Sequence, residues 1–186
     1  KRFFEILKSS GIDFYRGVLD SLLKDFCAYV TDNVSKKDHI INSNEGAAIA
    51  LASGHYIATG KPGLVYMQNS GEGNIINPVA SLLNDKVYAI PVVFIIGWRG
   101  EPGIYDEPQH IYQGEVTVKL LEDMDIKPFI IGKDTADEEV EKAMEDFKAI
   151  LATGKDVAFV IRKGALTDAP EAEYKNDNKM VREEII

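Results

Sequence analysis

Short runs of β-forming residues alternate along this chain with longer stretches of helical periodicity. The runs are roughly four to six residues long and the helical stretches about 10–15, a pattern typical of βαβ units and a parallel sheet. The run Val92–Gly97 is almost entirely apolar, as expected of a strand that helices cover on both faces. The sequence therefore predicts an α/β fold: a three-layer α/β/α sandwich around an open, mostly parallel sheet of about six strands.

The spacing of apolar residues assigns most of the chain to strands and helices. Strands are expected over residues 13–18, 39–42, 64–67, 92–97, 129–131 and 157–161, and helices over residues 2–9, 20–30, 45–59, 75–83, 115–124 and 140–151. Residues 98–113 lack clear periodicity, and a long irregular loop in a compact domain is usually functional or mobile. Residues 167–186 are polar and acidic, so we expect a domain over residues 1–166 followed by a linker or tail.

Composition limits what the chain can bind and where it can work. Because Cys27 is the single cysteine, an internal disulfide is excluded and a reducing, cytoplasmic setting is expected. No apolar run approaches the roughly 20 residues of a membrane-spanning helix. Residues 1–100 carry 9 Asp and Glu against 10 Lys and Arg, whereas residues 101–186 carry 21 against 11. The acidic second half argues against nucleic acid or an anionic membrane as a partner, and the near-neutral first half suits a small anionic molecule.

Ligands of open parallel sheets bind at the carboxyl ends of the strands. Four segments directly follow expected strands there, namely residues 17–20, 43–45, 68–74 and 97–110. In the second of these, Glu45 begins an Ala-rich helix. It is either a first-turn acid that the helix dipole stabilises or a site carboxylate, and the residues alone favour the first interpretation. The small side chains after it, at Gly46 and Ala47, would let a flat ligand approach closely.

The segment Gln68–Asn74 contains two glycines but matches no common motif. It lacks the third glycine of a dinucleotide fingerprint, because Ile76 stands there, and no Lys-Ser or Lys-Thr pair of a phosphate-binding loop follows it. It is either a tight strand-to-helix turn or a turn whose backbone N–H groups meet a ligand.

The irregular loop places Asp106, Glu107, Gln109 and His110 together. His110 is the best acid or base candidate among the histidines, whereas His39 and His55 are interpreted as ordinary surface residues. No His or Cys spacing supports a metal site, so no metal ligand is predicted in this chain.

Four segments taken together resemble one family. They are Asn44-Glu45-Gly46-Ala47-Ala48, Tyr66–Asn74, Gly97–Gly103 and Asp106–His110, within a similarity that runs from about Phe3 to about Lys163. They resemble the N-terminal, pyrimidine-binding domain of phosphonopyruvate decarboxylases, in the thiamine-diphosphate enzyme superfamily. The Gln-Asn-Ser-Gly run is shared with the α chain of sulfopyruvate decarboxylases, while the last two segments favour the phosphonopyruvate enzymes.

The resemblance implies a thiamine-diphosphate-binding fold and a set of site residues. Glu45 would bind the pyrimidine ring of the cofactor and take part in catalysis, and Asp20 and His110 would act in proton transfer or substrate contact. The remaining residues would bind the cofactor (Gln68, Asn69, Ser70, Gly71 and Asn74) or the substrate (Arg99 and Gln109). Leu19 stands where the family usually has a proline, which leaves the loop before Asp20 less rigid.

The implied reaction is the decarboxylation of 3-phosphonopyruvate to phosphonoacetaldehyde and CO2 in phosphonate (2-aminoethylphosphonate) biosynthesis. The Gly-Asp-Gly segment and downstream Asn that hold Mg2+ and the diphosphate in this superfamily are missing. The chain is therefore expected to be half an enzyme, inactive alone, which needs a diphosphate-binding domain or subunit and forms a homo-oligomer or pairs with that partner. Two alternatives stay open: the α chain of a sulfopyruvate decarboxylase and a non-catalytic α/β interaction domain.

Overall fold

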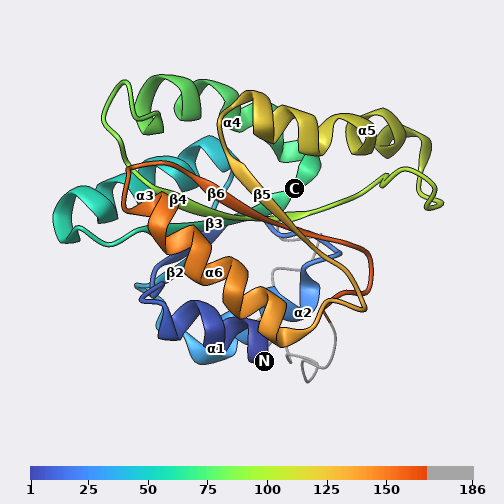
Figure 1. The fold of residues 1–186 in the computed structure, drawn as a ribbon, viewed down its shortest axis with the longest axis horizontal. Helices are drawn as coiled ribbons and strands as arrows, with labels where there is room; N and C mark the ends of the chain where they lie inside the picture. The colour runs from blue at the N-terminus through green and yellow to red at the C-terminus, as the bar shows by residue number, and fades with distance from the viewer. Residues whose placement is uncertain (167–186) are drawn as a thin grey trace, which may run out of the picture.

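The computed structural model describes residues 1–166, which form a single open sheet flanked by helices (Figure 1). The six strands are all parallel and lie in the order β2-β1-β3-β4-β6-β5. They are β1 (Tyr15–Gly17), β2 (His39–Ile41), β3 (Gly63–Gln68), β4 (Val92–Gly97), β5 (Lys127–Ile131) and β6 (Val157–Ile161). The expected fold class is confirmed. The expected linker or tail over residues 167–186 lies outside the described residues.

Helices cover both faces of the sheet, which gives three layers (Figure 1). On one face lie α1 (Arg2–Ser9), α2 (Lys24–Asn33) and α6 (Asp137–Leu151). On the other lie α3 (Glu45–Thr59), α4 (Glu72–Pro78) with its π-helical continuation η2 (Val79–Leu83), and α5 (Pro108–Asp123). A short 3-10 helix, η1 (Asn69–Gly71), joins β3 to α4. None of the helices in the described part is long and apolar enough to cross a membrane.

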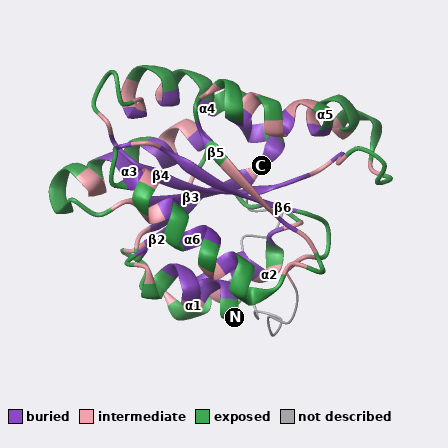
Figure 2. Ribbon diagram, viewed as in Figure 1, coloured by how far each residue is buried: buried purple, intermediate pink, exposed green. Residues whose placement is uncertain are grey.

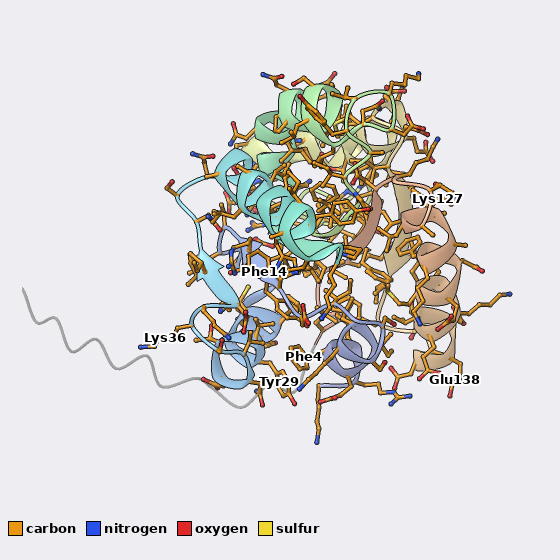
Figure 3. All side chains as sticks on the ribbon, turned by 90° about the vertical axis from the view of Figure 1, so that its left-hand side faces the viewer. Phe4, Phe14, Tyr29, Lys36, Lys127 and Glu138 are labelled. Atoms are coloured by element: carbon orange, nitrogen blue, oxygen red, sulfur yellow. The ribbon has the colours of Figure 1, made fainter. Side chains whose placement is uncertain are left out.

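The two faces bury different kinds of side chain. Under α1, α2 and α6 the core is rich in aromatic rings; Phe4 and Tyr29, for example, lie together in Figure 3 with ring centroids 5.1 Å apart. Under α3 and α5 it is mostly aliphatic, and the small side chains of Ala48 and Ala52 let α3 pack closely on the sheet. Between them, the central strands β3, β4 and β6 are buried almost throughout, as Figure 2 shows. Burial of each such large apolar side chain contributes about 1.5–3 kcal/mol.

Several expected boundaries differ in the structure, and three of the differences fall in segments that carry candidate site residues. Helix α5 begins at Pro108 rather than at residue 115, so the irregular loop covers residues 98–107 and Gln109 and His110 lie in the first helical turn. Proline suits the first position of a helix because its missing N–H would have no partner there. Residues 69–74, expected as a turn, are helical. Helix α2 begins only at Lys24, after a turn closed by the Leu23 N–H bonded to the Asp20 carbonyl.

His39 was expected on the surface, and that prediction is wrong. Its ring is buried between β2 and β3, and Nε2 lies 2.8 Å from the hydroxyl of Tyr66. Burial, and secondarily the nearby charge of Arg16, lower the pKa of His39. The hydrogen bond to the Tyr66 hydroxyl explains how a neutral histidine ring can be buried at the start of the outermost strand β2.

Candidate functional site

The carboxyl ends of the strands bring together most of the residues that the sequence singled out. The chain leaves β1 toward one edge of the sheet and leaves β3 toward the other, and this reversal of direction is the point at which ligands of open parallel sheets usually bind. Gln68 at the end of β3 pairs in register with Gly97 at the end of β4. Asp20 follows β1 at the same level, and Glu45 begins α3 beside the segment that follows β3.

Glu45 is held at the N-terminus of α3 by its neighbours in sequence and in space. Asn44 caps the helix, its Oδ1 accepting from the N–H of Ala47 at 2.8 Å. The Glu45 side chain is only 8% exposed, and its Oε2 accepts from Asn74 Nδ2 at 2.7 Å. A Cβ at Gly71 would lie 2.5 Å from Glu45 Oε1, so the carboxylate can sit here only because residue 71 is glycine. Oε1 forms no hydrogen bond within residues 1–166.

Asp20 lies in a second close-packed position. Its Oδ1 accepts from Gln68 Nε2 at 2.9 Å, and the hydroxyl of Ser70 donates to Gln68 Oε1 at 2.7 Å. A Cβ at Gly97 would overlap Asp20 Oδ2. Asp20 is 5% exposed, and Oδ2 is a buried atom without a hydrogen-bond partner in the described part of the chain. Beneath it, burial raises the pKa of the Cys27 thiol to about 12, and the negative charge of Asp20 adds to that effect.

Asn69 joins three elements and is completely buried. Its Nδ2 donates at 2.8 Å both to the carbonyl of Arg99 and to Oγ1 of Thr117, and its Oδ1 accepts from the Arg99 N–H at 3.2 Å. Its own carbonyl accepts from Gln113 Nε2 at 3.1 Å. With both ends of its amide occupied, Asn69 fastens the ends of β3 and β4 to α5. Direct contact of Asn69 with a cofactor stays a prediction.

Arg99 is engaged in a two-point ion pair with Asp106. Nε lies 2.7 Å from Oδ2 and Nη2 lies 2.5 Å from Oδ1, while Nη1 donates to the hydroxyl of Ser21 at 3.1 Å. The Asp106 carboxylate also accepts from the backbone N–H groups of Gly100 and Glu107. Hydrogen bonds from Arg99 and then from these N–H groups hold the pKa of Asp106 well below its usual range. Loop 98–107 is therefore ordered around Asp106, with Arg99 beside the turn that carries Asp20.

His110 and Gln109 lie at the start of α5. The carbonyl of His110 packs against Gly100, where a Cβ would overlap it, and Gln109 is exposed. Within residues 1–166 neither side chain forms a hydrogen bond with Asp20 or Glu45. The structure thus packs Glu45, Asp20 and Arg99 against neighbouring residues. It does not bring the side chains of Gln109 and His110 into hydrogen-bonding contact with the two carboxylates in the described part of the chain.

Glu72 is a buried carboxyl group that the sequence analysis did not single out. It is fully buried at the start of α4, with neither carboxyl oxygen hydrogen-bonded in the described part. Burial raises the pKa of Glu72 to about 8, and the nearby polar groups of Gln113 and Thr117 oppose this only in part. Glu72 is consequently a neutral acid over most of the physiological range.

Two site residues were missed because each acts on a partner distant in sequence: Gly97 makes room for Asp20, and the Ser21 hydroxyl accepts a hydrogen bond from Arg99. Asp106 was singled out as a neighbour of His110, whereas the structure pairs it with Arg99. For Gly97 the available signal was its position, since a glycine that ends a buried strand lies on the edge where ligands bind. Within residues 1–166 no group of three or more His, Cys, Asp or Glu side chains is arranged to hold a metal ion.

Two glycine-packed carboxylates at the carboxyl edge of a parallel sheet define a candidate ligand-binding α/β domain. Residues 1–122 match the family described as thiamine pyrophosphate enzyme, N-terminal TPP binding domain, and the chain belongs to this family. The predicted resemblance is thereby confirmed.

Several relatives are similar over most of this chain. A phosphonopyruvate decarboxylase of Streptomyces viridochromogenes is 36% identical over 151 residues, which cover 77% of this chain and 37% of that protein. One of Streptomyces hygroscopicus is 32% identical over 165 residues, covering 84% and 40%. A sulfopyruvate decarboxylase subunit alpha of Methanococcus maripaludis is 37% identical over 126 residues, covering 68% and 72%. The chain thus spans less than half the length of these two phosphonopyruvate decarboxylases.

A solved structure supports the fold. A thiamin diphosphate-dependent enzyme from Mycobacterium smegmatis superimposes with a TM-score of 0.65 at 18% identity, over 90% of this chain and 31% of that one. At this identity the likeness bears on the architecture alone.

Proposed function

We propose that this domain supplies the pyrimidine-binding half of a thiamine-diphosphate-dependent decarboxylase that converts 3-phosphonopyruvate to phosphonoacetaldehyde and CO2. The observation that carries the proposal is Glu45, a nearly buried carboxylate with one oxygen bound by Asn74 and the other unengaged. The family match and the two phosphonopyruvate decarboxylases among the relatives support the cofactor and the substrate.

The residues present fit the aminopyrimidine part of this cofactor. A ring with N–H groups needs acceptors that are already oriented, and Glu45 Oε1 is such an acceptor because Asn74 holds the other oxygen. Because residue 71 is glycine, only backbone and no side chain of that residue lies next to Glu45 Oε1. Asp20 Oδ2 is a second acceptor, for which residues 1–166 supply no donor. We assign the diphosphate and its Mg2+ to a second domain or subunit, which the name subunit alpha of three relatives supports.

Glu45 would act by holding a proton at the pyrimidine ring. When bound, thiamine diphosphate supplies the nucleophilic carbon and the electron sink that decarboxylation of a 2-oxo acid requires. A carboxylate at Glu45 Oε1 would stabilise a ring N–H and so would make the exocyclic nitrogen of the same ring more basic. A neutral amide in the same place would lack this effect, because it adds no negative charge beside the ring.

Arg99 would bind the anionic end of the substrate, with Asp20, Gln109 and His110 around the reacting carbon. Its ion pair with Asp106 fixes the plane of the guanidinium next to the Asp20 turn. A phosphonate can carry two negative charges and a sulfonate one, so Coulomb attraction to Arg99 favours the phosphonate. The pairing with Asp106 reduces this preference, since the guanidinium charge is partly neutralised.

A second candidate function is that of a sulfopyruvate decarboxylase subunit alpha. The observation that favours it is sequence identity: the Methanococcus maripaludis subunit is 37% identical over 126 residues, and one from Methanothermobacter thermautotrophicus is 32% identical over 156 residues. A purely structural interaction domain is disfavoured by the family match and by relatives that are named decarboxylases.

The proposal is tested by Glu45→Gln in the complete decarboxylase that contains this chain. Exchange of the cofactor C2 proton in deuterated buffer, followed by NMR, should slow by roughly 10²–10⁴, the usual size of a general acid–base contribution. The exposed Glu122 of α5, changed to Gln, is the matched control and should leave exchange unaltered. Exchange at the wild-type rate in Glu45→Gln would reduce Glu45 to a helix-capping acid and refute the proposal.

The substrate is tested separately by turnover of phosphonopyruvate and sulfopyruvate under the same conditions. Our proposal expects the larger kcat/KM for phosphonopyruvate. A larger value for sulfopyruvate would transfer the assignment to the second candidate and leave the role of Glu45 intact.

A further inference from the structure

We propose that Ser70 and Gln68 are positioning residues that fix the Asp20 carboxylate and leave its Oδ2 atom as the acceptor for a ligand's hydrogen. The resemblance assigns both residues to the cofactor, whereas their hydrogen bonds run to Asp20. The inference rests on the proposed function for the identity of the ligand. The hydrogen bonds that connect Ser70, Gln68 and Asp20 are observed in the structure and do not depend on that function.

The direction of the hydrogen bonds from Ser70 to Gln68 and from Gln68 to Asp20 follows from the chemistry of an amide. The Ser70 hydroxyl donates to Gln68 Oε1 at 2.7 Å, and Gln68 Nε2 donates to Asp20 Oδ1 at 2.9 Å. A side-chain amide has one accepting end and one donating end. By occupying the accepting end, Ser70 directs the donating end at Asp20. The reverse orientation would place two oxygens against each other.

Gly97 restricts the same carboxylate from a second side. It lies opposite Gln68 in the pairing of β3 with β4, and a Cβ there would overlap Asp20 Oδ2. The carboxylate is therefore enclosed between a side-chain donor on β3 and bare backbone at the end of β4. Its two oxygens are made unequal, because Oδ1 has a donor and Oδ2 has none within residues 1–166.

An unsatisfied oxygen at this point calls for an explanation. Buried polar atoms are nearly always hydrogen-bonded, and exceptions concentrate where function requires them. Asp20 Oδ2 lies at the edge of the sheet where ligands of this architecture bind. Its missing partner is a hydroxyl or amino hydrogen of the bound cofactor or substrate. With Oδ1 occupied by Gln68, a proton that transfers to Asp20 adds to Oδ2.

The hydrogen-bond chain can be measured without turnover. In the chain labelled with 15N, the Gln68 side-chain amide protons should shift in Ser70→Ala and stay near their wild-type positions in Ser70→Thr, which keeps the hydroxyl. Asp20→Asn should also shift them, which identifies the bond to Asp20. Ser81→Ala is the matched control, because Ser81 is exposed and donates to Asn77 on the far part of the same helical segment.

Kinetics of the complete decarboxylase then separate positioning from general support of the fold. Ser70→Ala should lower kcat about 3- to 10-fold, the effect of losing one modest hydrogen bond, with KM changed less than about twofold. Ser70→Thr should recover most of that loss. A loss confined to KM, or Gln68 signals in Ser70→Ala that coincide with the wild type, would overturn the inference.

The two proposals fail in different ways. If Glu45→Gln slows C2-proton exchange but the Ser70 variants leave the Gln68 signals and kcat unchanged, the proposed function stands and the positioning role is wrong. If Asp20→Asn turns over at the wild-type rate, Asp20 Oδ2 has no ligand and the inference is equally overturned. If Glu45→Gln exchanges like the wild type, the proposed function fails whatever Ser70 does.

Discussion

Glu45 and Asp20 lie at the same edge of the sheet and depend on the same device, a glycine that leaves room for a carboxylate, yet they are held differently. Glu45 belongs to a helix N-terminus, where local backbone, the Asn44 cap and Asn74 fix it. Asp20 belongs to a turn, and its oxygens are positioned by residues of two other strands. Within residues 1–166, each keeps one carboxylate oxygen without a hydrogen-bond partner. The difference teaches that one carboxylate is preset by secondary structure and the other by tertiary packing.

The largest effects are expected from adding one methyl group at either glycine. Gly71→Ala should displace Glu45 and Gly97→Ala should displace Asp20, and a displacement of about 1 Å can cost roughly 10²-fold in rate. C2-proton exchange should slow in Gly71→Ala and stay near wild type in Gly97→Ala, although turnover falls in both. Gly73→Ala, where an added Cβ meets no atom within 4 Å, is the control. Equal effects of the first two variants on exchange would erase the distinction between the carboxylates.

Glu72 sharpens the comparison, since it shows what burial does to a carboxyl group whose oxygens form no hydrogen bond within residues 1–166. Its pKa is raised from 4.5 to about 8, so the folded state binds a proton more tightly than the unfolded state. Its contribution therefore favours folding at low pH and is lost as pH rises from about 4.5 to about 8, by roughly 3 kcal/mol at pH 7.

Urea unfolding across this pH range measures that contribution. Glu72→Gln should abolish its share of the pH dependence and raise the free energy of unfolding at pH 7. Glu122→Gln, an exposed change on α5, should leave the pH dependence as it is. A wild-type slope in Glu72→Gln would mean that Glu72 is ionised and partnered in the folded protein.

A smaller effect is expected at the hydrogen bond that holds Glu45. Asn74→Ala removes the donor to Oε2, and because Asn74 is itself exposed, water can replace part of the lost bond. We expect C2-proton exchange to slow about 3- to 10-fold. Asn77→Ala, in the same helix with its side chain bonded to Ser81, should have no effect on exchange. An unchanged rate in Asn74→Ala would show that the helix alone orients Glu45.

The smallest effect is expected from the helix cap. Asn44→Ala removes the acceptor for the Ala47 N–H, which costs about 1 kcal/mol and lowers the midpoint of thermal unfolding by about 2–4 °C. The comparison variant is Asn33→Ala. Asn33 is the last residue of α2, and its side-chain amide donates to the Tyr29 carbonyl. Asn44→Ala should lower the stability more than Asn33→Ala does.

The unequal origins of the two carboxylates explain what the sequence could reveal. The six strands and the position of Glu45 follow from local patterns: alternation, a capping Asn and a helix of small residues. The surroundings of Asp20 come from Gln68, 48 residues away, and from Gly97 on a further strand. No local pattern carries such contacts, so the resemblance supplied Asp20 and only the structure supplied its partners.

The start of α5 was misjudged for a related reason. Periodicity marks a helix only where one of its faces is buried, and the first turns of α5 expose Ile111 and Tyr112. Pro108 is a typical first residue of a helix, but no buried apolar stripe accompanies it in the first turns of α5. His39 was misjudged because its partner Tyr66 lies on another strand.

The order of the strands has a further consequence for solubility. An outermost strand offers unpaired N–H and C=O groups onto which another chain can add and begin aggregation. Here one outermost strand, β2, has only three residues, and the other, β5, opens with Lys127 and Pro128. Pairing with a strand of another molecule is hindered at β2 because this strand is short. It is hindered at β5 by the charge of Lys127 and by the missing N–H of Pro128.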